Sequence, residues 1–405
     1  MKKYASFALV FGPLVTPYFF PGTTIPLENI FLFLNIIILS CYNKFKPVYH
    51  VPKGYNLFLI YALLAPIIGY LCYKNFDSFK SSYVSIVLFT TSLVLFIPHL
   101  EYWMVKKYYK ICVVFVIVIF LSQELMFNIV GYRFSALIPY LPVKYSHVST
   151  SEFIANQMIA PRSQSIFLEP SHFAQFLLGY LAILLGENVQ KRELFSASVL
   201  ALSLILLLTW SGNGIVLTLL LWFVFFVIVR INPLKKYFII FPVLLVATSI
   251  GLHYISSTEK GEKIMERTQE LEVEQERLSS GAVRIYRGYF VYSSMPLIEQ
   301  ITGVGSGTSS DAIEHSPYFF LFYDFERYLN NIQILLIGYG VLGALLFFLF
   351  LKNLTRYGNP VSLLCVVLFI GLCFIENFWG SVKMILYLAI PAVLCLNTQN
   401  RKQYS

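Results

Sequence analysis

Charged residues are scarce in this chain: Asp, Glu, Lys and Arg make up 13% of its 405 residues. A soluble domain carries roughly 25% charged residues, and a chain with half that share cannot cover a folded surface in water. Hydrophobic residues make up 57% of the sequence and aromatic residues 17%. The composition therefore excludes an ordinary soluble enzyme and a disordered protein. The net charge of +9 would suit a nucleic-acid binder, but its distribution along the chain assigns it to a membrane.

Cysteines and metal-binding motifs are also sparse. The six cysteines lie in or beside apolar runs, and no two of them have CxxC spacing. We interpret them as small apolar residues within a membrane rather than as a disulfide framework. The six histidines are scattered, with no HExxH motif and no Asp-rich cluster beside them. We therefore expect neither a catalytic metal nor a cofactor.

Long apolar runs are what the chain has in abundance. A helix needs about 20 apolar residues to cross the hydrocarbon core of a bilayer. Twelve candidate runs occur, at 5–20, 26–42, 55–73, 82–98, 111–130, 166–186, 194–210, 212–229, 237–254, 331–351, 361–377 and 382–396. The sequence predicts an all-α, polytopic integral membrane protein with about 12 transmembrane helices. We expect one transmembrane domain over residues 1–405.

The distribution of Lys and Arg predicts the orientation, because cytoplasmic loops carry an excess of both. With the N-terminus in the cytoplasm, the inner segments hold 17 of the 30 basic residues and three of the 21 acidic ones, a net charge of +14. The outer segments hold 13 basic and 18 acidic residues, a net charge of −5. Both termini are predicted in the cytoplasm. Two long loops, 131–165 and 255–330, are predicted outside, and residues 259–277 of the second are typical of a solvated helix.

Ionisable residues in or near the predicted spans gather towards the outer ends. They are Glu28, Glu124, Glu169, His172, His253, Glu376 and Lys383. A proton or ion pathway would carry polar groups through the midplane, so the pattern disfavours an ion-coupled transporter. It favours a site at the outer membrane surface. The alternative is that some of these residues only sit at the interface.

Glu169 and His172 are the most specific pair of candidate catalytic residues. Arg162 precedes them, and the run from Pro170 is typical of a helix with proline in its first turn. Spacing of three predicts that Glu169 and His172 share one helix face. A carboxylate, an imidazole and a guanidinium at one helix mouth could bind an anion and remove a proton from a hydroxyl. The alternative is a structural Arg162–Glu169 pair with His172 as a cap or packing residue.

The second outer loop adds two arginines. Arg284 and Arg287 lie three residues apart on an expected helix, and planar guanidinium groups suit phosphate oxygens. The alternative is an interfacial amphipathic helix whose arginines extend towards water. The run Gly303-Val304-Gly305-Ser306-Gly307 that follows is interpreted as a tight turn, with a backbone nest for an anion as the alternative.

Four stretches between about 160 and 350 resemble the O-antigen ligase and polymerase superfamily. They are Ser280 to Thr308 with Arg284 and Gly303-Val304-Gly305, Asn330 to Leu336 running into Gly338, Gly340 and Gly343, Arg162 to Phe173, and Thr209-Trp210-Ser211-Gly212. The stretch from Arg162 to Phe173 is similar to the Arg…Phe-x-Glu-Pro stretch of Wzy-type exopolysaccharide polymerases. O-antigen ligases usually carry a His-Asn pair before the last of their motif helices. Here Leu329-Asn330 stands in its place, which favours a polymerase over a ligase.

The resemblance implies a membrane glycosyltransferase. It would polymerise undecaprenyl-pyrophosphate-linked oligosaccharide units into O-antigen, capsule or exopolysaccharide at the outer face of the bacterial cytoplasmic membrane. Its implied partners are these lipid-linked sugars, membrane lipids, a flippase and a chain-length regulator, and no nucleic acid. The implied roles are a base at Glu169, assisted by His172, and pyrophosphate or substrate binding by Arg162, Arg284, Arg287 and Asn330. The alternatives are a ligase-like enzyme and a flippase or transporter of lipid-linked sugars, which would show inverted repeats.

Overall fold

The computed structural model describes residues 1–23, 25–44, 54–144, 150–159, 162–229, 280–322 and 329–403. Within these helices, the side chains of 159, 280–285 and 399–403 fall outside the description. The described segments are predominantly helical and contain no strand beyond two isolated β-bridges. The all-α prediction is therefore confirmed for this part of the chain.

The helices follow the predicted apolar runs closely. Those before the first predicted outer loop are α1 (Lys2–Phe11), α2 (Leu27–Tyr42), α3 (Tyr55–Tyr73), α4 (Phe76–Phe96) and α5 (Tyr102–Val130). Next come α6 (Thr150–Ile159), α7 (Pro170–Lys191), α8 (Ala197–Leu208) and α9 (Gly212–Ile228). After them come α12 (Ser280–Ser294), α13 (Leu297–Thr302), α14 (Ser309–Glu314), α15 (Asn331–Leu354), α16 (Pro360–Ile375) and α17 (Val382–Gln403). Short 3-10 turns are η1 (Gly12–Val15), η2 (Ile97–His99), η3 (Ser306–Thr308) and η4 (Phe319–Phe322).

Four described helices are long and apolar enough to cross a membrane. They are α3, α4 continued by η2, α5 and α15, and shorter apolar helices accompany them. The chain is thus a helical membrane protein by length and composition. The count of 12 spans stays a prediction, and its ninth span, 237–254, lies outside the described residues.

Three predicted boundaries were wrong for local reasons. The first run, 5–20, is helical only to Val15, with Pro13 in its final 3-10 turn. Helix α4 begins at Phe76 rather than 82, because the Asn75 side chain caps it by accepting hydrogen bonds from two backbone N–H groups. Helix α5 begins at Tyr102 rather than 111, because the turns that carry Lys106, Lys107 and Lys110 continue the same helix before the apolar run. Charge marks where a membrane ends, not where a helix ends.

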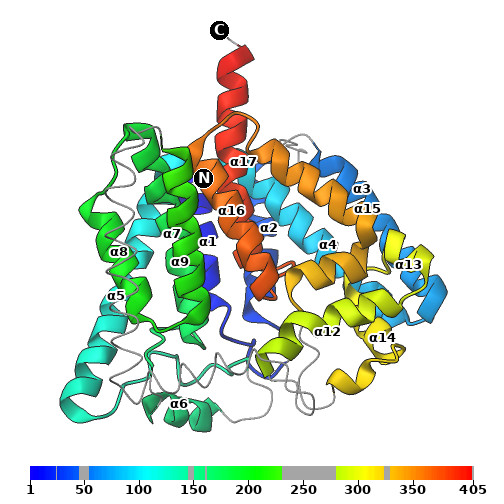
Figure 1. The fold of residues 1–405 in the computed structure, drawn as a ribbon, viewed down its shortest axis with the longest axis horizontal. Helices are drawn as coiled ribbons and strands as arrows, with labels where there is room; N and C mark the ends of the chain where they lie inside the picture. The colour runs from blue at the N-terminus through cyan, green and yellow to red at the C-terminus, as the bar shows by residue number, and fades with distance from the viewer. Residues whose placement is uncertain are drawn as a thin grey trace.

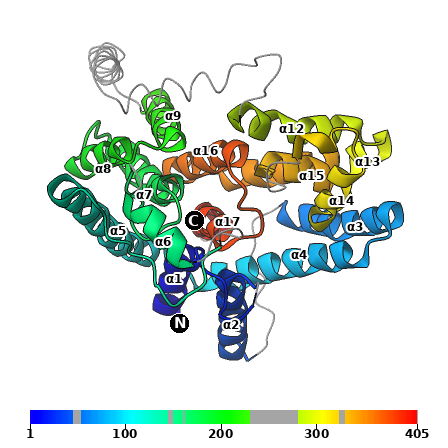
Figure 2. The ribbon, with the colours of Figure 1, turned by 90° about the horizontal axis from the view of Figure 1, so that it is seen from below.

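Helix α17 occupies the centre of the bundle. Figure 2 shows it nearly end-on, with α1, α7, α16 and α15 around it, and it contacts α1, α4, α5, α15 and α16. Its upper part extends beyond the bundle in Figure 1, whereas α6 crosses the opposite end. We call these the C-terminal end and the α6 end. A residue at the start of α17 therefore lies in the middle of the molecule, towards the α6 end.

The outward faces of the peripheral helices are apolar. On α5, Ile111, Val114, Val118, Leu125 and Ile129 are each more than half exposed. A soluble protein rarely leaves so large a contiguous apolar surface uncovered, whereas lipid tails would cover it without cost. The inward face of the bundle is closely packed, since a Cβ on Gly186 of α7 would approach the α16 backbone at Val361 to 2.5 Å.

Ion pairs join residues at matching ends of the helices. At the C-terminal end, Lys106 of α5 pairs with Glu187 of α7, and Lys2 pairs with Glu101. The hydrogen bond from Lys2 lowers the pKa of the Glu101 carboxyl below its usual value. At the α6 end, Arg133 lies 3.1 Å from Glu124. Each of these pairs therefore joins segments at one end of the bundle. The alternation of loops across a membrane, and which end faces the cytoplasm, stay predictions.

Helix α15 is broken at Gly340, whose φ of 62° and ψ of −174° depart from helical geometry. The break leaves backbone carbonyls without helical donors. Val304 N–H donates to the Ile337 carbonyl at 3.1 Å, and Gly305 N–H donates to the Gly338 carbonyl at 2.7 Å. The Gly303–Gly305 segment therefore docks against a broken helix. A backbone nest for an anion was the alternative expected here, and these two N–H groups are committed to α15 instead.

The docking of this segment depends on Gly69 of α3. A Cβ at that position would lie 1.9 Å from the Val304 carbonyl oxygen, so Gly69→Ala must separate α3 from the segment. We expect a loss of about 1 to 3 kcal/mol of stability from this overpacking, measured as a lower thermal transition of the purified protein in detergent. Gly212→Ala is the matched control, since no atom lies within 4 Å of its added Cβ. Equal transitions for the two variants would contradict the docked arrangement.

Candidate functional site

A pocket of about 210 Å³ opens at the α6 end, against the start of α17. We call it the α17 pocket. Its polar lining residues are Glu28, Lys144, His172, Asn377, Ser381 and Lys383, and Phe167, Leu168 and Phe378 are among its apolar ones. These residues come from the start of α2, the first predicted outer loop, the start of α7, the α16–α17 connection and α17. Segments far apart in the sequence therefore supply one polar cavity.

Lys144 reaches the pocket because its loop is pinned to the chain after η1. Lys144 N–H donates to the Pro17 carbonyl at 2.9 Å, and Phe19 N–H donates to the Pro142 carbonyl at 2.8 Å. The Tyr18 hydroxyl accepts a further hydrogen bond from Ile138 N–H at 2.9 Å. The Lys144 ammonium then forms an ion pair with the Glu28 carboxylate. One cation of the pocket is thus already neutralised by an anion.

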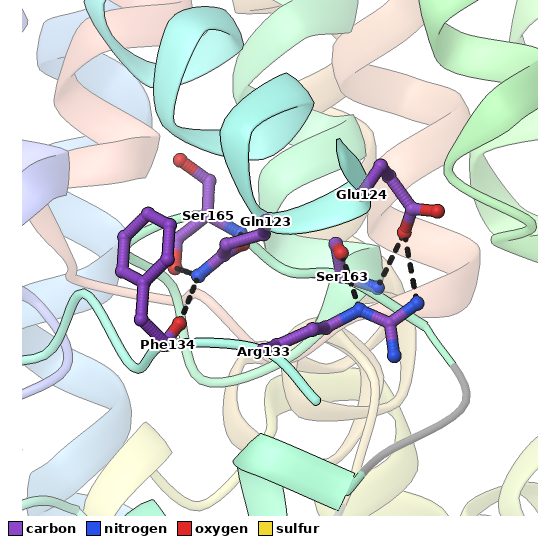
Figure 3. A network of polar contacts seen from close by, with 6 residues as sticks. All are labelled: Gln123, Glu124, Arg133, Phe134, Ser163 and Ser165. Carbon is purple, nitrogen blue, oxygen red and sulfur yellow. Dashed lines mark hydrogen bonds and ion pairs between the residues drawn. The ribbon is translucent and has the colours of Figure 1, made fainter. Parts of the chain in front are cut away.

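A polar network fixes the segment that precedes α7 (Figure 3). Arg133, 2% exposed, donates from Nε to the Ser163 hydroxyl at 2.6 Å, and its Nη2 lies 3.1 Å from Glu124 Oε1. The same Glu124 oxygen accepts from Ser163 N–H at 3.3 Å. Beside it, Ser165 N–H donates to the Gln123 amide oxygen at 2.8 Å. The network ties residues 163–165 to the end of α5 and so positions the pocket wall that follows them.

His172 is the sequence-predicted site residue that lines the pocket. Its Nε2 lies 3.8 Å from Oε2 of Glu376, an ion-pair distance that is longer than a direct hydrogen bond. Within the described segments, Nδ1 of His172 has no hydrogen-bond partner. An imidazole beside a carboxylate, with one nitrogen unused, is the arrangement that general acid–base catalysis requires.

Glu169 lies directly before α7 and not within it. It is the N-cap residue of the helix, with an extended backbone of φ −141° and ψ 152°. Its carboxylate is exposed and accepts a hydrogen bond from the Ser171 hydroxyl at 3.0 Å. The helix face that it was predicted to share with His172 stays a prediction. The catalytic role of Glu169 stays a prediction.

Asn330 and Asn331 hold the α16–α17 connection in place. The Asn330 side chain caps α15 by accepting from Gln333 N–H at 2.9 Å, and it donates to the Phe374 carbonyl at 3.0 Å. Asn331 N–H donates to the Glu376 carbonyl at 2.9 Å. Asn330 was predicted to bind substrate, and the structure uses its side chain to position the segment that carries Glu376. Its effect on the site is therefore indirect.

Arg162 and Arg287, the two predicted arginines whose side chains the structure describes, have different contacts. Arg162 donates to the Trp210 carbonyl at 3.0 Å, next to the Ser-rich turn before α9. Arg287 is buried, with its guanidinium carbon 4.6 Å from the centre of the Phe322 ring. The Arg284 side chain lies outside the described residues. Neither Arg162 nor Arg287 is among the residues that line the α17 pocket.

Sequence reasoning found some pocket residues and missed others. Glu28, His172, Glu376 and Lys383 were identified as ionisable residues at outer span ends, but no pattern placed them together. Lys144 and Arg133 were missed as site residues. A lysine directly after a proline-rich loop stretch, and an arginine directly after α5, were the available signals. Among the described residues, no three His, Cys, Asp or Glu side chains group as a metal site, and the expectation of metal-free chemistry stays untested.

No protein-family model matches the chain, and no curated protein matches it. The family resemblance therefore rests on the motifs alone.

Proposed function

We propose that this protein is a membrane glycosyltransferase that polymerises lipid-linked oligosaccharide repeat units. The motif resemblance suggests the class of reaction. The observation that carries the proposal is the α17 pocket, which is lined by His172 and two lysines, with Glu376 3.8 Å from His172. Such a pocket combines a proton acceptor with positive charge, and it lies at the end of apolar helices where a lipid-borne substrate would present its head group.

The proposed step transfers the growing chain from undecaprenyl pyrophosphate to a new lipid-linked unit. A hydroxyl at the non-reducing end of the new unit attacks the anomeric carbon of the chain, forming a C–O bond. The bond from that carbon to the phosphate oxygen breaks, and the pyrophosphate leaves with the electron pair. His172 accepts the hydroxyl proton and Glu376 stabilises the resulting imidazolium. Cations can stabilise the charge that develops on the leaving group.

The proposal needs the α6 end to face the outside of the cytoplasmic membrane. Tyr140, in the first predicted outer loop, is 90% exposed, and Lys3 lies near the predicted inner end. In a background without the six native cysteines, we expect Tyr140→Cys to react with a membrane-impermeant maleimide in whole cells. Lys3→Cys should react only after permeabilisation. The reverse labelling pattern would contradict the predicted orientation and the outer-face site.

Loss of the gene tests the function in cells. We expect a deletion strain to accumulate single lipid-linked repeat units in place of long polysaccharide, and the wild-type gene to restore chain length. Long polysaccharide in the deletion strain would exclude an essential polymerase role. A strain that makes free polymer but fails to attach it to a lipid acceptor would favour the ligase-like alternative.

Transport of lipid-linked sugars is the second candidate, and the break in α15 favours it, since transporters often use discontinuous helices at their binding sites. Here the carbonyls at the break accept hydrogen bonds from Val304 and Gly305, which makes the break a packing feature. If the protein were a flippase, its deletion would leave lipid-linked units on the inner leaflet, whereas deletion of a polymerase would leave them on the outer leaflet. The location of the accumulated units therefore separates the two candidates.

A further inference from the structure

Lys383 stands out among the cations of the molecule. It is the second residue of α17, the central helix, and it lines the α17 pocket together with His172. In the part of the chain that the structure describes, its ammonium has neither a hydrogen-bond acceptor nor an ion-pair partner. By contrast, Lys144 on the same pocket is paired with Glu28. An ammonium away from bulk water without a direct partner is costly, and such groups usually mark function in membrane proteins.

The surroundings of Lys383 explain how its charge is tolerated without a partner. The carboxylates of Glu376, Glu28 and Glu169 act on it electrostatically, and Lys144 opposes them. None of the three carboxylates reaches 4.0 Å from its nitrogen in the described contacts, and Glu28 and Glu376 have Lys144 and His172 as partners. Burial disfavours the charge of Lys383 and is the larger effect, so the distant carboxylates offset only part of its cost. The hydrogen-bond donors of the ammonium remain available to a charged ligand in the pocket.

The size of the pocket limits what that ligand can be. Sites for whole small molecules occupy about 300 to 1,000 Å³, and this pocket has about 210 Å³. It can enclose one charged group and the atoms next to it, and the rest of a repeat unit would lie outside it. An open ammonium with three donors suits a phosphate oxygen as a point charge.

We propose that Lys383 is the anion-binding group of the α17 pocket and that it takes a phosphate of the lipid-linked pyrophosphate. This inference rests on the proposed function for the identity of the anion, and it places the leaving group on a residue of α17 instead of on the arginines of the outer loops. His172, on the same pocket wall, then stands beside the reacting carbon while Lys383 holds the departing pyrophosphate.

Binding to the purified full-length protein in detergent tests the inference, with inorganic pyrophosphate and undecaprenyl pyrophosphate as separate probes. We expect Lys383→Met to weaken binding by about ten- to a hundredfold, because a charge-assisted hydrogen bond is lost. Lys383→Arg should stay within about threefold of the wild type, since it keeps the charge. Lys80→Met is the matched control, because Lys80 is exposed, lies away from the α17 pocket and contacts only its own helix, at Asp77 and Phe76, in the described contacts. Binding of the lipid form alone identifies the anion as lipid-borne, and binding of both identifies the phosphate group as sufficient.

A second measurement uses the wild-type protein and does not depend on the folding of a variant. We expect pyrophosphate to protect Lys383, but not Lys80, from an amine-acylating reagent, as read by mass spectrometry. Equal acylation with and without pyrophosphate, or unchanged binding in Lys383→Met, would overturn the inference. If Lys383-dependent binding is found but no polymer forms from lipid-linked units, the anion site stands and the proposed function fails. If polymer forms and Lys383→Met keeps full turnover and binding, the proposed function stands and the anion site at Lys383 fails.

Discussion

The His172→Gln protein is expected to fold normally and to lose about a hundredfold or more of its polymerisation rate, which is the usual contribution of a general base. Glutamine keeps a similar volume and a hydrogen-bonding side chain towards Glu376, but it cannot accept a proton at neutral pH. Turnover of lipid-linked repeat units by purified protein measures the loss. His99→Gln is the matched control, since His99 contacts Asn43 at the C-terminal end of the bundle, away from the pocket.

The same assay separates the two candidate bases. Glu169→Gln removes the exposed carboxylate that sequence spacing nominated, while its Ser171 contact can persist. If Glu169→Gln loses most turnover while His172→Gln stays near normal, the proton acceptor is Glu169 and the pocket assignment is wrong. If only His172→Gln loses turnover, the base is the residue that lines the pocket. Near-normal rates in both variants would exclude acid–base catalysis from this helix end.

Arg133→Met is expected to cost about 1 to 3 kcal/mol of stability, the usual effect of leaving buried polar groups without their partner, because the Glu124 side chain is 31% exposed and water screens its charge. Arg133 is 2% exposed, and its loss leaves Glu124 and the Ser163 hydroxyl without their cation. The fall in thermal transition of the detergent-solubilised protein measures this cost. Lys110→Met, at an exposed position of α5, the helix that carries Glu124, should leave the transition unchanged.

A double variant checks the cause of that loss. Glu124→Gln removes the charge left unpaired by Arg133→Met and keeps an oxygen that can accept from Ser163 N–H. We expect Arg133→Met with Glu124→Gln to recover part of the lost stability, since no partly buried carboxylate then lacks its cation. If the double variant is as unstable as the sum of the single ones, the two residues act independently and the network in Figure 3 does not fix the segment before α7.

The helices were predictable because apolar runs near the length of a bilayer leave few other structures available. The ends of the helices were less predictable from the sequence. Asn75 caps α4 from outside the apolar run, and the lysines at the start of α5 continue the helix beyond it. The break at Gly340 was not predictable, since it depends on donors from the Gly303–Gly305 segment, which is far away in the sequence. Local pattern defines helices, and tertiary contacts define where they break.

The candidate site was predictable only in part. His172 was found because an ionisable residue at a span end is unusual. Its predicted pairing with Glu169 rested on helical spacing, and Glu169 lies just before the helix in extended backbone. The approach of His172 to Glu376, and the pocket that it lines together with Lys383, needed the packing of α7 against α16 and α17. No spacing rule could have supplied it.

The most direct test of the central claim is to supply lipid-linked repeat units to the purified wild-type protein and to separate the products by length. The account predicts a ladder of lipid-linked chains that lengthens with time, together with released undecaprenyl pyrophosphate. Repeat units that stay single, with the protein folded and the α6 end accessible to substrate, would contradict it.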